Sequence, residues 1–242
     1  MIRVIAHRGF SGRFPENTAL AFERAITSGA HLIETDLRLT RDGSVVCSHD
    51  PDLARMAGER KAIADATLAE LKAAPLAQSQ VLLTLGEVLA IARGKVRVML
   101  DVKIDSDAMR AAILKTVRAA GMETDVVYGV RSVGHLRALR DLNSTLPVLA
   151  MPARPELLSD FLGSGVHAAR LWEDEVSPQA VECVRSSGLH LWVTAGRRPD
   201  GEAAGYITAG RLERLIALGA VAVLVNDVEL AVRVTCPGRY PT

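Results

Sequence analysis

Eight short apolar segments alternate with amphipathic helical segments along this 242-residue chain, and the alternation limits its fold more than any other feature. Strands that alternate with helices form parallel sheets, because each helix carries the chain back over one face of the sheet. Eight such units with right-handed crossovers close into a barrel, which needs a chain of about this length. The predicted strands are residues 3–6, 31–37, 96–101, 125–128, 147–151, 167–171, 190–194 and 221–225.

Glycines mark where several of the helical segments end. Gly29, Gly121, Gly188 and Gly219 each follow such a segment, at the position where a left-handed residue ends a helix. The predicted helices are residues 19–28, 108–120, 133–142, 155–162, 178–187 and 209–218.

The stretch after the second strand departs from the strand–helix rhythm. The Asp42-Gly43 pair predicts a turn, after which residues 44–48 form an extra strand that pairs back. Residues 66–73 and 85–92 then have helical patterns. No low-complexity linker divides the chain. We therefore expect residues 1–242 to form a single domain of the α/β class, a (β/α)8 TIM barrel with only a short insertion after its second strand.

Composition excludes several classes of function. The net charge of +1 comes from dispersed charges of both signs, which leaves no basic surface for nucleic acid, and no apolar run is long enough to span a membrane. Three cysteines without metal-type spacing, together with an N-terminal apolar run too short for a secretion signal, predict a cytoplasmic protein with reduced thiols. Cys47 is expected to be a buried strand residue. The sequence does not define the oligomeric state.

Two histidines and two carboxylates lie at the ends of predicted strands within the first fifty residues. His7 and His49 each follow a short apolar run. Glu34 and Asp36 are two residues apart on one strand, so their side chains point to the same face and can converge on one cation. Such oxygen ligands suit Mg²⁺ or Ca²⁺ rather than zinc. Because the carboxyl ends of barrel strands carry the chemistry, the pattern predicts an acid/base pair beside a metal, as phosphodiester cleavage requires.

A second pair of residues on one face, Asp101 and Lys103, ends the next barrel strand. The simplest interpretation is an ion pair across one residue. The functional interpretation makes Asp101 a third metal ligand and Lys103 a charge partner for phosphate.

Four further motifs occur in a characteristic order: Ala6-His7-Arg8-Gly9, Pro15-Glu16-Asn17-Thr18, Glu34-Thr35-Asp36 and His49-Asp50. Their order and spacing resemble the glycerophosphodiester phosphodiesterases, and weaker resemblance continues through residues 52–55, 83–89, 101–103, 191–194 and 223–227. The resemblance implies a (β/α)8 barrel that uses a divalent cation to hydrolyse glycerophosphodiesters, which are small molecules, to sn-glycerol 3-phosphate and an alcohol.

The resemblance also assigns roles to residues of this chain. It implies the acid/base catalysts His7 and His49, the metal ligands Glu34, Asp36 and Asp101, and the substrate-binding residues Arg8, Lys103 and Trp192. Considered alone, a tryptophan on a strand is more often a core residue. Glu16 and Asn17 are expected to order the loop beside His7, and Asn17 or Thr18 can cap the first helix.

The chain departs from the family pattern in three places. The third metal ligand of the family is normally glutamate, whereas Asp101 is one methylene shorter, and some related venom lyases share the aspartate and lysine. Only residues 51–94 are available to cover the substrate. The usual Thr-Asp that ends the eighth strand is replaced by Val225-Asn226 or Asn226-Asp227, depending on the register.

Two alternative functions stay open. Asp101 and the short insertion favour a phospholipase D-like lyase that converts lysophospholipids to a cyclic phosphate, although no apolar cluster for lipid docking is evident. The other alternative is a non-catalytic barrel that binds phosphodiesters, and the presence of both His7 and His49 argues against it. In the enzymes, either water or a neighbouring substrate hydroxyl can be the nucleophile.

Overall fold

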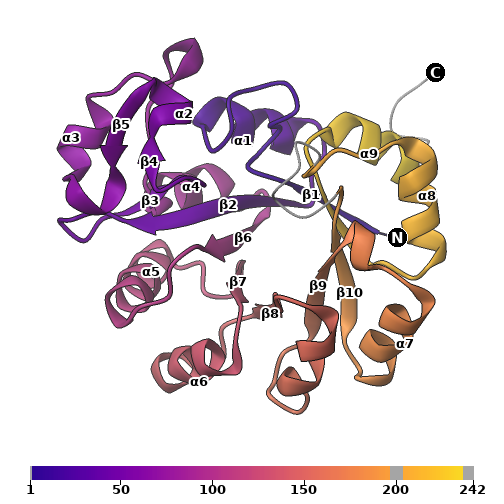
Figure 1. Ribbon diagram of the computed structural model, residues 1–242. Helices are drawn as coiled ribbons and strands as arrows, with labels where there is room; N and C mark the ends of the chain where they lie inside the picture. The colour runs from indigo at the N-terminus through magenta and orange to yellow at the C-terminus, as the bar shows by residue number, and fades with distance from the viewer. Residues whose placement is uncertain (1, 197–203, 237–242) are drawn as a thin grey trace.

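The apolar segments predicted as strands pair side by side in parallel and close on themselves. The computed structural model describes residues 2–196 and 204–236, and within them eight parallel strands form one ring (Figure 1). In order around the ring they are β1 (Arg3–Ala6), β2 (Leu32–Leu39), β6 (Arg97–Val102), β7 (Val126–Val130), β8 (Val148–Ala150), β9 (Ala168–Trp172), β10 (His190–Thr194) and β11 (Ala222–Val225). The pairing of β1 with both β2 and β11 closes the barrel, which confirms the predicted (β/α)8 fold.

Helices surround the ring on its outer side (Figure 1). They are α1 (Ala19–Thr27), α4 (Leu85–Ala92), α5 (Asp107–Ala120), α6 (Val133–Leu142), the 3₁₀ helix η3 (Pro155–Phe161), α7 (Pro178–Ser186), α8 (Ala209–Ala217) and α9 (Val228–Thr235), and α4 packs between α1 and α5. A further 3₁₀ helix, η4 (Glu173–Glu175), directly follows β9. Most of the outer helices begin at a serine or threonine whose side chain accepts a hydrogen bond from the first turn, as Thr18 does for α1. The glycines predicted at helix ends, such as Gly29 and Gly121, have positive φ angles.

Two outer helices differ from the sequence prediction. Residues 155–162 were expected to be α-helical, whereas the short connector η3 has the tighter 3₁₀ form that is common in such pieces. Helix α9 was not predicted. Its N-cap is Asp227, whose side chain accepts a hydrogen bond from the backbone N–H of Leu230.

The insertion after β2 begins with the predicted extra strand, β3 (Val45–Cys47), which pairs antiparallel with β2. A small hairpin that was not predicted follows, and then the two predicted helices. The elements are β4 (Asp52–Leu53), α2 (Ala54–Ala57), β5 (Glu59–Ala62), η1 (Ile63–Asp65), α3 (Leu68–Lys72), η2 (Ala77–Ser79) and α4 (Leu85–Ala92). Leu53, Ile63, Leu71 and Leu82 form a separate apolar cluster under this insertion.

The apolar core has two main parts. The larger part lies between the strands and the outer helices, and it includes Cys47, whose burial raises its thiol pKa to about 12. The second part fills the barrel itself, with one or two inward side chains from each strand, such as Ile5, Leu32, Met99 and Trp192. Within the described residues no helix is long and apolar enough to cross a membrane.

Candidate active site

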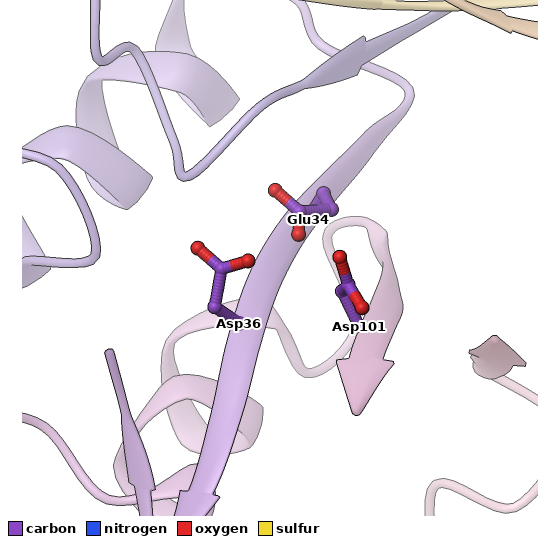
Figure 2. Close-up of side chains that lie close together, drawn as sticks. All are labelled: Glu34, Asp36 and Asp101. Carbon is purple, nitrogen blue, oxygen red and sulfur yellow. The ribbon is translucent and has the colours of Figure 1, made fainter. Parts of the chain in front are cut away.

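Three carboxylates converge inside the carboxyl end of the barrel. Glu34 and Asp36 lie on β2, and Asp101 lies directly across from Asp36 on the neighbouring strand β6. One ligand oxygen from each residue lies within 4.8 Å of the others (Figure 2). Glu34 and Asp36 are almost completely buried. The convergence predicted from the two-residue spacing is therefore present, and Asp101 joins it.

Burial and neighbouring charges act differently on the three carboxylates. Burial, followed by the charges of Asp36 and Asp101, raises the pKa of Glu34 well above its usual range. Burial also opposes ionisation of Asp36, but Lys103 and Arg8 outweigh it and hold the pKa of Asp36 below its usual value. The ammonium of Lys103 and the guanidinium of Arg131 do the same for Asp101. Two of the carboxylates are thus held ionised by cations from the protein.

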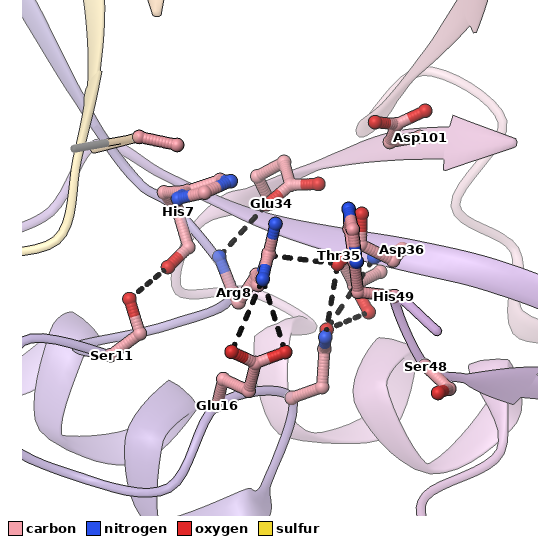
Figure 3. Close-up of polar contacts among 12 residues, drawn as sticks. His7, Arg8, Ser11, Glu16, Glu34, Thr35, Asp36, Ser48, His49 and Asp101 are labelled. Carbon is pink, nitrogen blue, oxygen red and sulfur yellow. Dashed lines mark hydrogen bonds and ion pairs between the residues drawn. The ribbon is translucent and has the colours of Figure 1, made fainter. Parts of the chain in front are cut away.

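Lys103 and Arg8 supply these cations for Asp36. Lys103 Nζ lies 2.6 Å from Asp36 Oδ1 and 2.9 Å from Asp101 Oδ2, so it bridges two strands. Arg8 Nε lies 3.1 Å from Asp36 Oδ2, and the Arg8 backbone N–H donates a 2.8 Å hydrogen bond to Glu34 Oε2. Both residues predicted to bind phosphate therefore lie at the carboxylates, and Figure 3 shows Arg8 there. Their contact with a phosphate stays a prediction.

Arg131, a third cation, was not predicted from the sequence. Its Nη2 atom lies 2.5 Å from Asp101 Oδ1, and its Nη1 atom donates a 2.6 Å hydrogen bond to the carbonyl of Val102. Arg131 directly follows β7, the strand beside β6. The sequence predicts a strand that ends at residue 128, whereas β7 ends at Val130. The shorter predicted strand gave no reason to expect Arg131 at the mouth of the barrel.

The buried amide of Asn17 orients the end of β2. Asn17 Nδ2 donates to Asp36 Oδ2 over 3.1 Å, and Asn17 Oδ1 accepts from the hydroxyl of Thr35 over 2.9 Å. Thr18, not Asn17, caps α1. The loop after β1 turns back to the site through Arg8, which has a φ of 56°, and Gly9, where a Cβ atom would come within 2.7 Å of the Ala21 backbone.

His7 follows β1 and is fixed by a residue from the opposite end of the sequence. Its Nδ1 atom lies 2.8 Å from Oδ1 of Asn226. Asn226 donates through Nδ2 to the carbonyl of Ala204, so its Oδ1 is the acceptor and His7 Nδ1 carries the proton. Burial, assisted by the positive charge of Arg8, lowers the pKa of His7 to about 4. Only 8 % of His7 is exposed to solvent, so burial favours the neutral form of its ring.

His49 is fixed through the insertion. Its Nδ1 atom lies 2.8 Å from Asp50 Oδ1, and Asp50 Oδ2 accepts a 2.6 Å hydrogen bond from Nε of Arg55. Arg55 Nη2 in turn lies 2.8 Å from Glu16, which also pairs with Arg8. Glu16 therefore orders the loop beside His7, as expected, through its ion pair with Arg8 (Figure 3). Arg55 and Asp50 connect Glu16 to His49.

Trp192 lies on β10, and Asn226 directly follows β11. Trp192 faces the inside of the barrel, within the buried apolar cluster, and is 6 % exposed. Its contact with substrate stays a prediction. Asn226 was noted only as a departure from the family pattern, and the structure resolves the register: Asn226 faces His7, and Asp227 caps α9.

These features define a class of protein, namely a (β/α)8 barrel with an acidic cluster, cations and two histidines at its carboxyl end. The model of the glycerophosphoryl diester phosphodiesterase family matches residues 7–193. The chain belongs to this family, which is a family of phosphoric diester hydrolases.

Relatives and solved structures show the same similarity. A glycerophosphodiester phosphodiesterase from Bacillus altitudinis is 47% identical over 72 residues, which cover 30% of this chain and only 29% of that protein. One from Caldanaerobacter subterraneus is 26% identical over 97% of this chain and 98% of its own length. The structure of a phosphodiesterase from Oleispira antarctica matches with a TM-score of 0.83 and 19% identity, over 96% of each chain, which shows a shared fold.

Proposed function

We propose that this protein hydrolyses glycerophosphodiesters to sn-glycerol 3-phosphate and an alcohol, with a divalent cation at the acidic cluster. The observation that carries the proposal is the set of three carboxylates within 4.8 Å of one another, close to two histidines that are each fixed at Nδ1. The full-length relative from Caldanaerobacter subterraneus is named for this activity. The Oleispira antarctica phosphodiesterase was solved with sn-glycerol-3-phosphate as its product.

The donor set fits a divalent cation. Glu34, Asp36 and Asp101 would hold it through carboxylate oxygens alone, which is the chemistry of Mg²⁺ and Ca²⁺ sites. When bound, such a cation supplies positive charge for a non-bridging phosphate oxygen and lowers the pKa of a bound hydroxyl group.

The histidines would move the protons. His7 carries its proton on Nδ1, where Asn226 accepts it, so Nε2 has the lone pair that a general base needs. His49 has a carboxylate beside Nδ1, and Asp50 offers the counter-charge that a protonated ring requires. We therefore assign His7 as the base and His49 as the acid that protonates the leaving alkoxide.

Arg8 and Lys103 would bind the substrate phosphate. Both side chains are 15% exposed and are fixed by buried carboxylates, so their charges are oriented before substrate arrives. Preorganised cations in a site of this kind stabilise the charge that grows on phosphate in the transition state.

The function is tested with glycerophosphocholine as substrate. With Mg²⁺ or Ca²⁺, phosphorus NMR is expected to show sn-glycerol 3-phosphate, and no product is expected after treatment with a chelator. Product formation that persists after complete removal of metal would contradict the metal site. A cyclic phosphate as the final product, or turnover of lysophosphatidylcholine alone, would show the lyase instead.

The acidic limb of the pH–rate profile is expected to lie well below pH 6.5. A base must be unprotonated, and burial lowers the pKa of His7 to about 4, so His7 stays neutral when pH falls through the range where an exposed histidine takes up a proton. Measurement of kcat/KM from pH 4 to 9 checks this. A limb at about pH 6.5 or above would contradict the assignment of His7 as a buried neutral base.

Changes at Asp101 test whether the site is adapted to aspartate. Asp101 is held by Lys103 and Arg131, so glutamate should displace the carboxylate by about one methylene, and a displacement near 1 Å costs about 10²-fold in a preorganised site. Asp101→Glu is therefore expected to lower kcat, and Asp101→Asn should lower it further because charge is also lost. A glutamate variant as fast as the parent would show that Asp101 is not adapted to this pocket.

A further inference from the structure

We propose that Arg131 binds the substrate phosphate, so that with Lys103 it forms a two-cation receptor for anionic oxygens on the β6–β7 side of the barrel. This inference rests on the proposed function and deepens it. It adds a specificity-determining residue that recognises the anionic part of the diester and of the monoester product.

Position in the sheet places Arg131 beside Lys103. Asp101 on β6 pairs with Gly129 on β7. Two residues further along the chain, Lys103 and Arg131 directly follow the ends of β6 and β7, and both side chains reach the carboxylate of Asp101. The two cations therefore lie next to each other at the mouth of the barrel.

Arg131 and Lys103 both pair with the carboxylate of Asp101. Arg131 pairs with Oδ1 of Asp101 and Lys103 pairs with Oδ2, so each oxygen has its own positive partner. If a divalent cation binds Asp101, it takes over the role of neutralising that carboxylate and repels both neighbouring cations. The ion pairs of Arg131 and Lys103 with Asp101 then weaken, and their N–H donors become available to an anion.

Arg131 is also anchored independently of Asp101. Its Nη1 atom donates to the Val102 carbonyl, which keeps the guanidinium at the mouth when the ion pair weakens. The side chain is 39% exposed, whereas that of Lys103 is 15% exposed, so Arg131 is the more accessible of the two. A planar guanidinium has five N–H donors and can hold two oxygens of a phosphate at once.

Charge balance favours an anion as the occupant. The three clustered carboxylates are matched by Arg8, Lys103 and Arg131. Addition of a divalent cation leaves an excess of positive charge in this part of the barrel, and phosphate oxygens offset it.

The test compares two binding constants in Arg131→Gln. Calorimetry would measure binding of Mg²⁺ or Ca²⁺ to the substrate-free protein, and binding of sn-glycerol 3-phosphate in the presence of the same metal. Loss of a charged hydrogen bond is expected to weaken binding of the phosphate by about 10- to 100-fold. Metal affinity should stay equal or rise, because a competing cation has been removed. KM should increase with the weaker phosphate binding, with kcat changed much less.

Two further variants serve as controls. Arg131→Lys keeps the charge without the planar fork and should recover part of the phosphate affinity. Arg118→Gln removes an exposed arginine near the end of α5, the helix that leads to the start of β7, and should leave both binding constants unchanged.

The opposite pattern of results would overturn the inference. Unchanged phosphate affinity in Arg131→Gln, or a fall in metal affinity alone, would make Arg131 a positioning residue for Asp101. Either result can occur while the wild-type protein hydrolyses glycerophosphocholine, so it leaves the proposed function standing. If the wild type shows no turnover, the proposed function fails, but the phosphate-binding comparison still decides the role of Arg131.

Discussion

Replacement of either histidine by alanine is expected to lower kcat by about 10²–10⁴-fold, because each variant removes one of the two proposed proton-transfer groups. Different residues fix the two rings at Nδ1: Asn226 fixes His7, and Asp50 fixes His49. Neither partner is shared, so neither can act in place of both histidines. The two variants should nevertheless fold. His49 is 31% exposed, and loss of the His7 hydrogen bond should cost about 1 kcal/mol. Turnover of glycerophosphocholine and the far-UV circular dichroism of each variant are the measurements.

A histidine distant from the site provides the matched control. His190 is exposed at the start of β10, which is the opposite end of the barrel from the carboxylates, and His190→Ala should keep the parent rate. A near-parent rate in His7→Ala or His49→Ala would remove the acid/base assignment for that residue. A folded double variant with the same residual rate as one single variant would show that the two histidines act in one step.

The barrel and the acidic cluster could be predicted because both depend on local periodicity. Alternation of strands and helices defines a parallel sheet, and a spacing of two residues places Glu34 and Asp36 on one face. The position of Asp101 needed only the further rule that active residues lie at the carboxyl ends of barrel strands. These predictions hold whichever exact residues pair across the sheet.

Asn226 and Arg131 could not be predicted in this way because their roles depend on the register between strands. Asn226 meets His7 across 219 positions of sequence, and only closure of β11 onto β1 brings the two together. Arg131 required the exact end of β7. The lowered pKa of His7 could not be predicted for a related reason, since burial of a strand-end side chain depends on the loops that cover it.

The second large effect is expected from Asp36→Asn, which removes the charge that holds two cations. Asp36 Oδ1 pairs with Lys103 and Oδ2 with Arg8, and the carboxylate is almost fully buried. Removal of one partner from buried ion pairs typically costs 3–5 kcal/mol, and about 3 kcal/mol is expected here because both cations keep a second carboxylate. Metal affinity and turnover should fall together, since the remaining two carboxylates compensate a divalent cation poorly.

Glu34→Gln provides the contrasting variant for Asp36→Asn. Glu34 accepts one backbone hydrogen bond, from Arg8, and holds no side-chain ion pair in the described part of the chain, so its replacement leaves both Lys103 and Arg8 paired. Rising Mg²⁺ or Ca²⁺ should therefore partly restore the rate of Glu34→Gln and not that of Asp36→Asn. Urea unfolding, metal calorimetry and turnover would be measured on both, with Glu182→Gln as an exposed control on α7. Parent-like metal affinity in both variants would show that these carboxylates are structural, because a ligand of the cation cannot lose its charge without weakening the site.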